Sequence, residues 1–164
     1  MNKKKAVFLD RDGVINKNKN NYVKTIDELE IFQQIEIPIK KLKENDFYVI
    51  VITNQSAVNR NLISIEQLNK IHLFIQNYLE VFGTRIDRFY FCPHRPDENC
   101  NCRKPKTGMF LKAIEEFNID PKLSWMIGDH DSDIQAGLEL GCNVIKINQK
   151  INLQIAVEQI LSSQ

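Results

Sequence analysis

The 164-residue sequence has no long apolar run. Nothing in it approaches the roughly 18 consecutive apolar residues of a membrane-spanning helix. The apolar run at residues 6–9 follows three lysines, but it is too short for the core of a signal peptide and ends in an acidic residue. We therefore expect a cytoplasmic protein without a membrane partner.

An excess of charge of either sign is also missing, because Lys and Arg together number 22 and Asp and Glu 21. No overall field then favours nucleic acid over a small molecule, so any affinity for phosphate must be built locally. Repeats, low-complexity tracts and Gly/Ser-rich linkers are missing as well. A chain of this length can bury a core without disulfides, and we expect a single domain over residues 1–164 that acts as a monomer.

Short apolar runs alternate with segments of helical periodicity. Such runs are typical of strands that are buried on both faces. Their alternation with helices predicts right-handed crossovers and a doubly wound parallel sheet of the α/β class. The predicted strands cover residues 5–9, 48–52, 88–91, 125–127 and 143–147.

Three helices are predicted from apolar stripes and end signals. The clearest begins at Ser64, where Ser64 and Gln67 fit a capping box, and ends at Gly83. A second has its apolar face over residues 110–117 and ends at Asn118. A third covers residues 35–42.

Polar clusters follow the predicted strands, at the edge where parallel sheets bind ligands. Asp10 and Asp12 stand two residues apart after the first strand. A carboxylate that attacks a phosphoryl group needs a divalent cation to offset repulsion, and donors around the transferred oxygens. Thr53, Lys104 and Asp129 supply a hydroxyl, a positive charge and a second metal-binding carboxylate. Magnesium suits a site with few carboxylates.

Each of these pieces has a plainer interpretation. Residues 10–13 could be only a turn, Thr53 could simply end a strand, and Lys104 could be a solvated loop residue. The acids near residue 131 could serve a helix start in which Ser132 and Gln135 form a capping box. Their joint occurrence at successive strand ends favours the catalytic interpretation, because independent structural accidents would rarely produce it.

The motifs resemble those of the haloacid dehalogenase superfamily over nearly the whole chain. The resemblance implies that Asp10 forms an aspartyl-phosphate and that Asp12 protonates the leaving oxygen and then activates water. It also implies that Thr53 and Lys104 hold the phosphoryl oxygens. The four matching motifs are Asp10-Arg11-Asp12-Gly13, Thr53, Lys104, and Asp129 with Asp133.

The same resemblance implies a magnesium site made by the side chains of Asp10 and Asp129 and the backbone carbonyl of Asp12. Asp133 would orient Lys104 or a metal-bound water. Only about forty residues lie between the first two motifs, too few for a separate cap domain.

Three thiols and one imidazole crowd into a second cluster. Structural zinc takes four such ligands in a tetrahedron and leaves no position open for catalysis. In a cytosolic protein this grouping indicates a metal before it indicates disulfides, although reduced cysteines beside an ordinary histidine are the plainer alternative. We favour structural zinc, held by Cys92, His94, Cys100 and Cys102.

Two further residues of metal-binding type stand apart from this cluster. His72 lies beside Ile71 in the long predicted helix and is more typical of a surface or packed residue than of a ligand. Cys142 has apolar neighbours and is most simply a small core residue.

Within the superfamily, the sequence resembles two groups of phosphatases that act on small phosphorylated metabolites. One group removes the 7-phosphate of D-glycero-D-manno-heptose 1,7-bisphosphate, and the other acts on histidinol phosphate. Tyr22-Val23, Thr53-Asn54-Gln55-Ser56 and Lys106-Thr107-Gly108-Met109 resemble the heptose group, which we favour. The five-residue loop between His94 and Cys100 resembles the histidinol group.

Three positions depart from the heptose group, because Ala57 and Asn61 stand where that group usually has glycine, and His130 differs as well. His130 stands where that group usually has a lysine, which is expected to meet the second phosphate of the substrate. A non-catalytic binding protein on the same fold is the alternative from another class, and the presence of all the catalytic residue types speaks against it. The expected phosphate and substrate contacts, besides Thr53 and Lys104, are Asn18, Asn21, Asn54, Arg60, Arg103 and His130.

Overall fold

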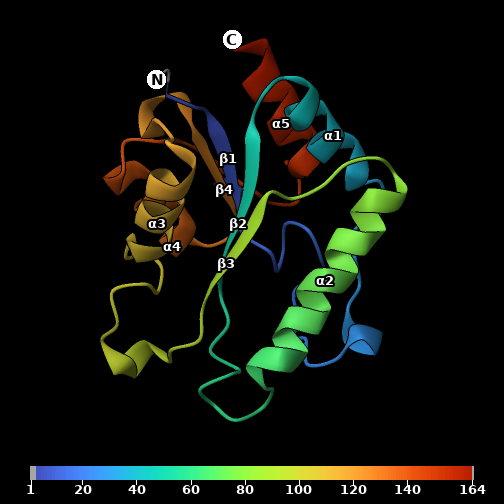
Figure 1. The fold of residues 1–164 in the computed structure, drawn as a ribbon, viewed down its shortest axis with the longest axis vertical. Helices are drawn as coiled ribbons and strands as arrows, with labels where there is room; N and C mark the ends of the chain where they lie inside the picture. The colour runs from blue at the N-terminus through green and yellow to red at the C-terminus, as the bar shows by residue number, and fades with distance from the viewer. Residues whose placement is uncertain (1–2, 164) are drawn as a thin grey trace.

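The computed structural model describes residues 3–163. Five parallel strands form one sheet in the order β3-β2-β1-β4-β5. The chain therefore starts in the middle of the sheet, winds to one edge and then to the other (Figure 1), which confirms the predicted doubly wound α/β fold. The strands are β1 (Ala6–Leu9), β2 (Tyr48–Asn54), β3 (Arg88–Cys92), β4 (Trp125–Gly128) and β5 (Asn143–Lys146).

Helices cover both faces of this sheet. They are α1 (Glu36–Glu44), α2 (Ile65–Val81), α3 (Gly108–Phe117), α4 (Asp131–Glu139) and α5 (Leu153–Ser162). Helices α1, α2 and α5 pack on one face, and α3 and α4 on the other (Figure 1). Only α1 and a short 3-10 turn at Ile26–Glu28 lie between β1 and β2, so no separate cap domain is inserted there.

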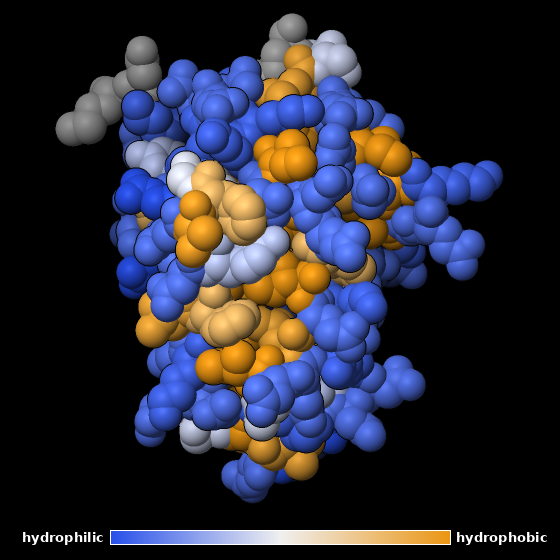
Figure 2. All heavy atoms as spheres, turned by 90° about the vertical axis from the view of Figure 1, so that its right-hand side faces the viewer, coloured by the Kyte–Doolittle hydropathy of each residue, from blue (hydrophilic) through white to orange (hydrophobic). Residues whose placement is uncertain are grey.

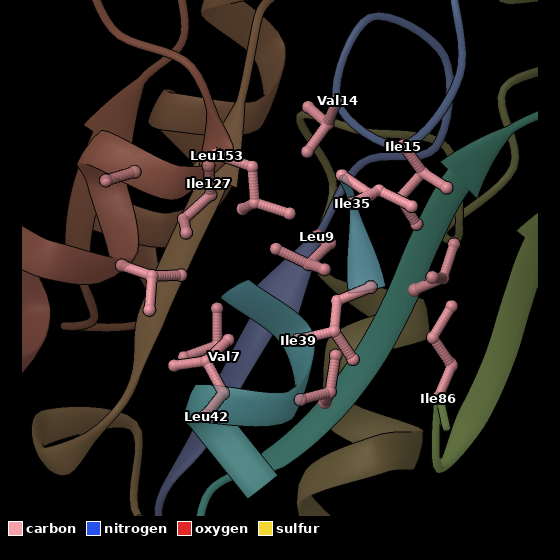
Figure 3. Close-up of a cluster of buried hydrophobic side chains, with 14 of the residues drawn as sticks. Val7, Leu9, Val14, Ile15, Ile35, Ile39, Leu42, Ile86, Ile127 and Leu153 are labelled. Carbon is pink, nitrogen blue, oxygen red and sulfur yellow. The ribbon is translucent and has the colours of Figure 1, made fainter. Parts of the chain in front are cut away.

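The side chains of strand β1 are buried on both faces of the sheet. Val7 and Leu9 enter the core beneath α1 (Figure 3), whereas Ala6 and Phe8 enter the core beneath α3 and α4. Because both faces are covered, every residue of the strand is apolar rather than every second one. Burial of each large apolar side chain contributes about 1.5–3 kcal/mol relative to exposure.

The helix ends follow the predicted signals, with two differences. The Ser64 hydroxyl caps α2 by accepting from the Gln67 N–H, and Asn118 ends α3 in the left-handed conformation. At α4 the capping residue is His130 instead of Ser132, and the Asp133 carboxylate accepts from the His130 N–H at 3.1 Å. Helix α5 was not among the predicted helices.

Several apolar side chains reach the surface along α2 and directly after it. Leu73, Phe74, Val81 and Phe82 are exposed there. Figure 2, which views this side of the molecule, shows apolar patches separated by hydrophilic surface. In the described part of the chain no helix combines the length and apolarity that a membrane span requires.

Helix α4 packs closely against the sheet at Gly137. A Cβ at this position would lie 2.7 Å from Val144 Cγ1 and 2.8 Å from Met126 Cβ. Although Gly→Ala stabilises an open helix by about 1 kcal/mol, overpacking here opposes that gain. We predict that Gly137→Ala lowers the free energy of unfolding by about 1–2 kcal/mol in urea titrations. Gln135→Ala on the exposed side of α4 is the control, and a more stable Gly137→Ala protein would contradict the packing described.

Candidate active site and cysteine cluster

Lys104 lies at the centre of the polar groups at the carboxyl ends of the strands. Its ammonium contacts Asp10 Oδ1 at 3.0 Å and Asp133 Oδ1 at 2.7 Å, and donates to the Ile52 carbonyl at 2.6 Å. Burial opposes its charge, but the two carboxylates raise the pKa of Lys104 above its usual value. The lysine is therefore a permanent, fixed positive charge, and Asp133 orients it.

Asp10 is buried against this lysine immediately after β1. Its Oδ1 also accepts from the Arg11 N–H at 2.8 Å, which fixes the direction of the carboxylate. Burial raises the pKa of Asp10 to about 6, with Asp133 and Asp12 adding to the effect and Lys104 opposing it. A nearby cation would favour the ionised form that a nucleophile requires.

The end of β2 holds the backbone of Lys104, in the loop that follows Cys102. The Asn54 side chain accepts from the Lys104 N–H at 3.0 Å and donates to the Lys104 carbonyl at 3.2 Å. Thr53 is fully buried, and its hydroxyl accepts from Gln55 Nε2 at 2.9 Å. Thr53 and Asn54 are thus part of the strand rather than of a loop after it, and the amide of Asn54 positions Lys104.

Asp12 is held by donors from three sides. Arg11 contacts both of its oxygens, at 2.9 and 3.1 Å from Nη2, while Asn16 donates to Oδ1 at 2.9 Å and Gln55 to Oδ2 at 2.7 Å. Burial works against ionisation, but Arg11 and the amide donors lower the pKa of Asp12 below its usual value. The pair Asp10 and Asp12 therefore has environments that push the two pKa values in opposite directions.

A group of potential metal ligands lies beside Asp10. Ligand atoms of Asp10, Asp129, His130 and Asp133 are all within 4.8 Å of one another. Gly13 leaves the space that Asp129 occupies, because a Cβ at Gly13 would lie 2.1 Å from Asp129 Oδ2. His130 Nδ1 contacts Asp129 Oδ1 at 2.7 Å. Carboxylate oxygens grouped in this way fit a hard divalent cation.

A cavity of about 350 Å³ opens over these groups. Two arginines, Arg60 and Arg103, line it together with His130. Asn21 is not among its described lining residues, and the Asn21 carbonyl accepts instead from Lys24 Nζ at 2.9 Å. The loop after β1 lines the cavity with the predicted Asn18 and also with Lys19, Asn20 and Tyr22.

The four predicted zinc ligands come together at the end of β3. Cys92 Sγ lies 3.1 Å from Cys102 Sγ and 3.6 Å from Cys100 Sγ, and His94 Nδ1 lies 3.2 Å from Cys102 Sγ. Zinc–sulfur bonds of about 2.3 Å in a tetrahedron place sulfurs about 3.8 Å apart, so the cluster has about the size of a zinc site. Although burial opposes ionisation, hydrogen bonds led by the Arg103 N–H lower the pKa of Cys100 to about 7.

Two residues at the site have a role that the sequence did not predict. Arg11 is fully buried and pairs with Asp12, and Gln55 bridges Asp12 and Thr53. Both lie inside the motifs described above, next to predicted site residues. An arginine between two acids, after a fully apolar strand, is a usable signal, since a buried guanidinium requires an anionic partner.

A buried aspartate–lysine pair at the strand ends of a doubly wound sheet is the arrangement of HAD-like hydrolases, and a HAD-hydrolase-like family model matches residues 101–152. The D-glycero-β-D-manno-heptose-1,7-bisphosphate 7-phosphatase of Haemophilus ducreyi is 38% identical over 145 residues, which cover 84% of this chain and 79% of that one. The enzyme of the same name from Helicobacter pylori (strain 26695) is 41% identical over 139 residues, with 84% and 80% covered.

Among solved structures, the D,D-heptose 1,7-bisphosphate phosphatase from B. bronchiseptica, complexed with magnesium and phosphate, superposes with a TM-score of 0.89. It is 29% identical, and the superposition covers 98% of this chain and 99% of that one. The chain therefore belongs to the HAD-like hydrolases, in the branch of the heptose 1,7-bisphosphate 7-phosphatases.

Asp133 and Asp131, two residues apart in α4, test the role assigned to the buried lysine. Asp133 is buried against Lys104, so Asp133→Asn weakens the compensation of a buried charge and should lower the free energy of unfolding by roughly 3 kcal/mol. Asp131 pairs with Lys146 at the surface, and Asp131→Asn should unfold at the same urea concentration as the wild type. Equal stability of the two variants would contradict the buried ion pair.

Proposed function

We propose that the chain is a phosphatase that removes the 7-phosphate of D-glycero-D-manno-heptose 1,7-bisphosphate. The observation that carries this proposal is the Asp10 carboxylate held against the permanently charged Lys104, with Asp12 two residues away. The names of the relatives described above support the phosphatase activity and the sugar substrate. Those relatives give no support to histidinol phosphate as the substrate.

In this mechanism an Asp10 oxygen attacks phosphorus while the bond from phosphorus to the sugar oxygen breaks. Asp12, whose lowered pKa requires that it take up a proton first, gives that proton to the sugar oxygen, which leaves as the alcohol. Asp12, now a carboxylate, takes a proton from water, and the water oxygen attacks the aspartyl-phosphate to release inorganic phosphate and restore Asp10. Lys104 stabilises the charge on the transferred phosphoryl oxygens.

Magnesium is the proposed cofactor, held by the side chains of Asp10 and Asp129 and the backbone carbonyl of Asp12. The cluster of carboxylates and the space left by Gly13 support this choice. When bound, the ion offsets the repulsion between the attacking carboxylate and the phosphoryl group.

The cavity over the site supports a substrate with a second anionic group. Arg60 and Arg103 provide two guanidinium groups beside His130, and the volume falls in the range of small-molecule sites. Arg103 is directed by its own contact, because its Nη1 donates to the His94 carbonyl at 3.2 Å.

A substrate panel tests the proposed function. With magnesium present, phosphate release should have a higher kcat/KM for heptose 1,7-bisphosphate than for histidinol phosphate or simple sugar monophosphates, by about tenfold or more, because charged hydrogen bonds hold the second phosphate. Asp10→Asn, which keeps the shape but loses the nucleophile, is the control and should release none. Preference for histidinol phosphate, or normal release by Asp10→Asn, would contradict the proposal.

We also propose that Cys92, His94, Cys100 and Cys102 bind one structural zinc ion. Thiolate and imidazole ligands select zinc, whereas carboxylate and water suit magnesium. The cluster directly precedes the lysine loop, so the metal would hold Lys104 in place without joining the reaction.

Elemental analysis of extensively dialysed protein tests this assignment. We expect one zinc per chain and no retained magnesium. Cys102→Ser should lose the zinc and unfold at a lower temperature, because metal binding contributes to folding. Cys142→Ser, at the buried cysteine outside the cluster, should keep it. A zinc-free wild-type protein of full stability would contradict the proposal.

A further inference from the structure

His72, on α2, is a buried residue that the proposed mechanism does not use. Its ring stacks on Phe89 of β3, with centroids 4.7 Å apart and planes 17° apart, and is tilted against Phe91 at 6.1 Å. Its Nε2 lies 3.2 Å from Nη1 of Arg11. The histidine is therefore fixed by the edge of the sheet and points at the catalytic loop.

The contact between His72 and Arg11 has one chemical interpretation. A guanidinium is always charged and only donates, so Nε2 of His72 must accept and the ring proton must be on Nδ1. Burial, and then the charge of Arg11, lower the pKa of His72 to about 3, which keeps the ring neutral. His72 is thus a permanent acceptor for Arg11.

Arg11 divides its donors between two partners. Nε and Nη2 face the carboxylate of Asp12, at 3.3 Å and 2.9 Å from Oδ1, while Nη1 faces His72. The guanidinium is planar, so fixing Nη1 also fixes the edge that contacts Asp12. Since Arg11 is fully buried, no solvent competes for these donors.

We propose that His72 is a positioning residue that acts through Arg11 to hold the carboxylate of Asp12 in place for proton transfer. The inference rests on the proposed function, because it assigns Asp12 the acid and base roles. Sequence spacing gives no sign of it, since His72 is 61 residues from Arg11. A misplacement of about 1 Å at a reacting group can cost about a hundredfold in rate, so a remote acceptor of this kind matters.

Three variants separate positioning from packing. His72→Phe keeps an aromatic ring against Phe89 but removes the acceptor, and His72→Gln restores an acceptor oxygen at about the reach of Nε2. Tyr78→Phe is the control, because it removes a different side-chain hydrogen bond of α2, from Tyr78 to Glu36 at 3.2 Å.

The assay follows p-nitrophenyl phosphate in the first turnover and in the steady state. Nitrophenolate leaves without a proton, so phosphorylation of Asp10 does not need Asp12, whereas hydrolysis of the aspartyl-phosphate does. For His72→Phe we expect one rapid equivalent of nitrophenolate per chain, followed by a steady state with kcat about 10- to 100-fold lower than in the wild type. Slower hydrolysis of the aspartyl-phosphate lowers KM by itself, and after correction for this effect KM should equal that of the wild type. His72→Gln and Tyr78→Phe should retain wild-type kcat within a few fold.

Other outcomes overturn the inference. Full turnover by His72→Phe, or loss of the first equivalent together with turnover in a folded protein, would show that His72 does not act through Asp12. If His72→Phe does not fold, His72→Asn replaces it, because its shorter amide does not reach Arg11, and equal kcat for the Asn and Gln variants contradicts the role. A wild-type protein that releases no first equivalent of nitrophenolate contradicts the proposed function, and the inference then fails with it.

Discussion

The buried charge of Lys104 is the constraint on which the arrangement of the site depends. A single ammonium buried without partners would be very unfavourable, so the fold must bring anionic and carbonyl oxygens to it from several segments. Asp10 after β1, the Ile52 carbonyl of β2 and Asp133 of α4 do so. The three segments are distant in sequence but meet because β1, β2 and β4 are neighbours in a parallel sheet.

A second buried cation, Arg11, is held in a similar way beside Asp12. Its partners are the carboxylate of Asp12 and the neutral ring of His72. Each catalytic carboxylate thus has its own cation, and the two pKa values shift in opposite directions: burial dominates at Asp10, while donors dominate at Asp12. Two aspartates two residues apart therefore lie in different environments, and a nearby cation would favour the ionised Asp10 that the attack requires.

Much of the fold could be predicted from the sequence, because strands buried on both faces are continuous apolar runs with polar residues at their ends. Helix α5 was missed although its signal is present, with Asn152 as the cap and apolar residues 153, 156, 157 and 160 at helical spacing. Two contacts of the site could not be predicted. The Asn54 side chain binds the backbone of Lys104, 50 positions away, and His72 contacts Arg11, 61 positions away. Such contacts depend on how helices and loops pack, which local sequence does not specify.

The central claim is that the carboxylate of Asp10, and not that of Asp12, carries the phosphoryl group. Turnover can be stopped early with borohydride, which reduces an aspartyl-phosphate to homoserine, and the modified residue located by mass spectrometry of the peptide that spans residues 6–17. The account predicts homoserine at position 10 and unmodified aspartate at position 12. Modification at position 12, or phosphate release without any modification at position 10, would contradict it.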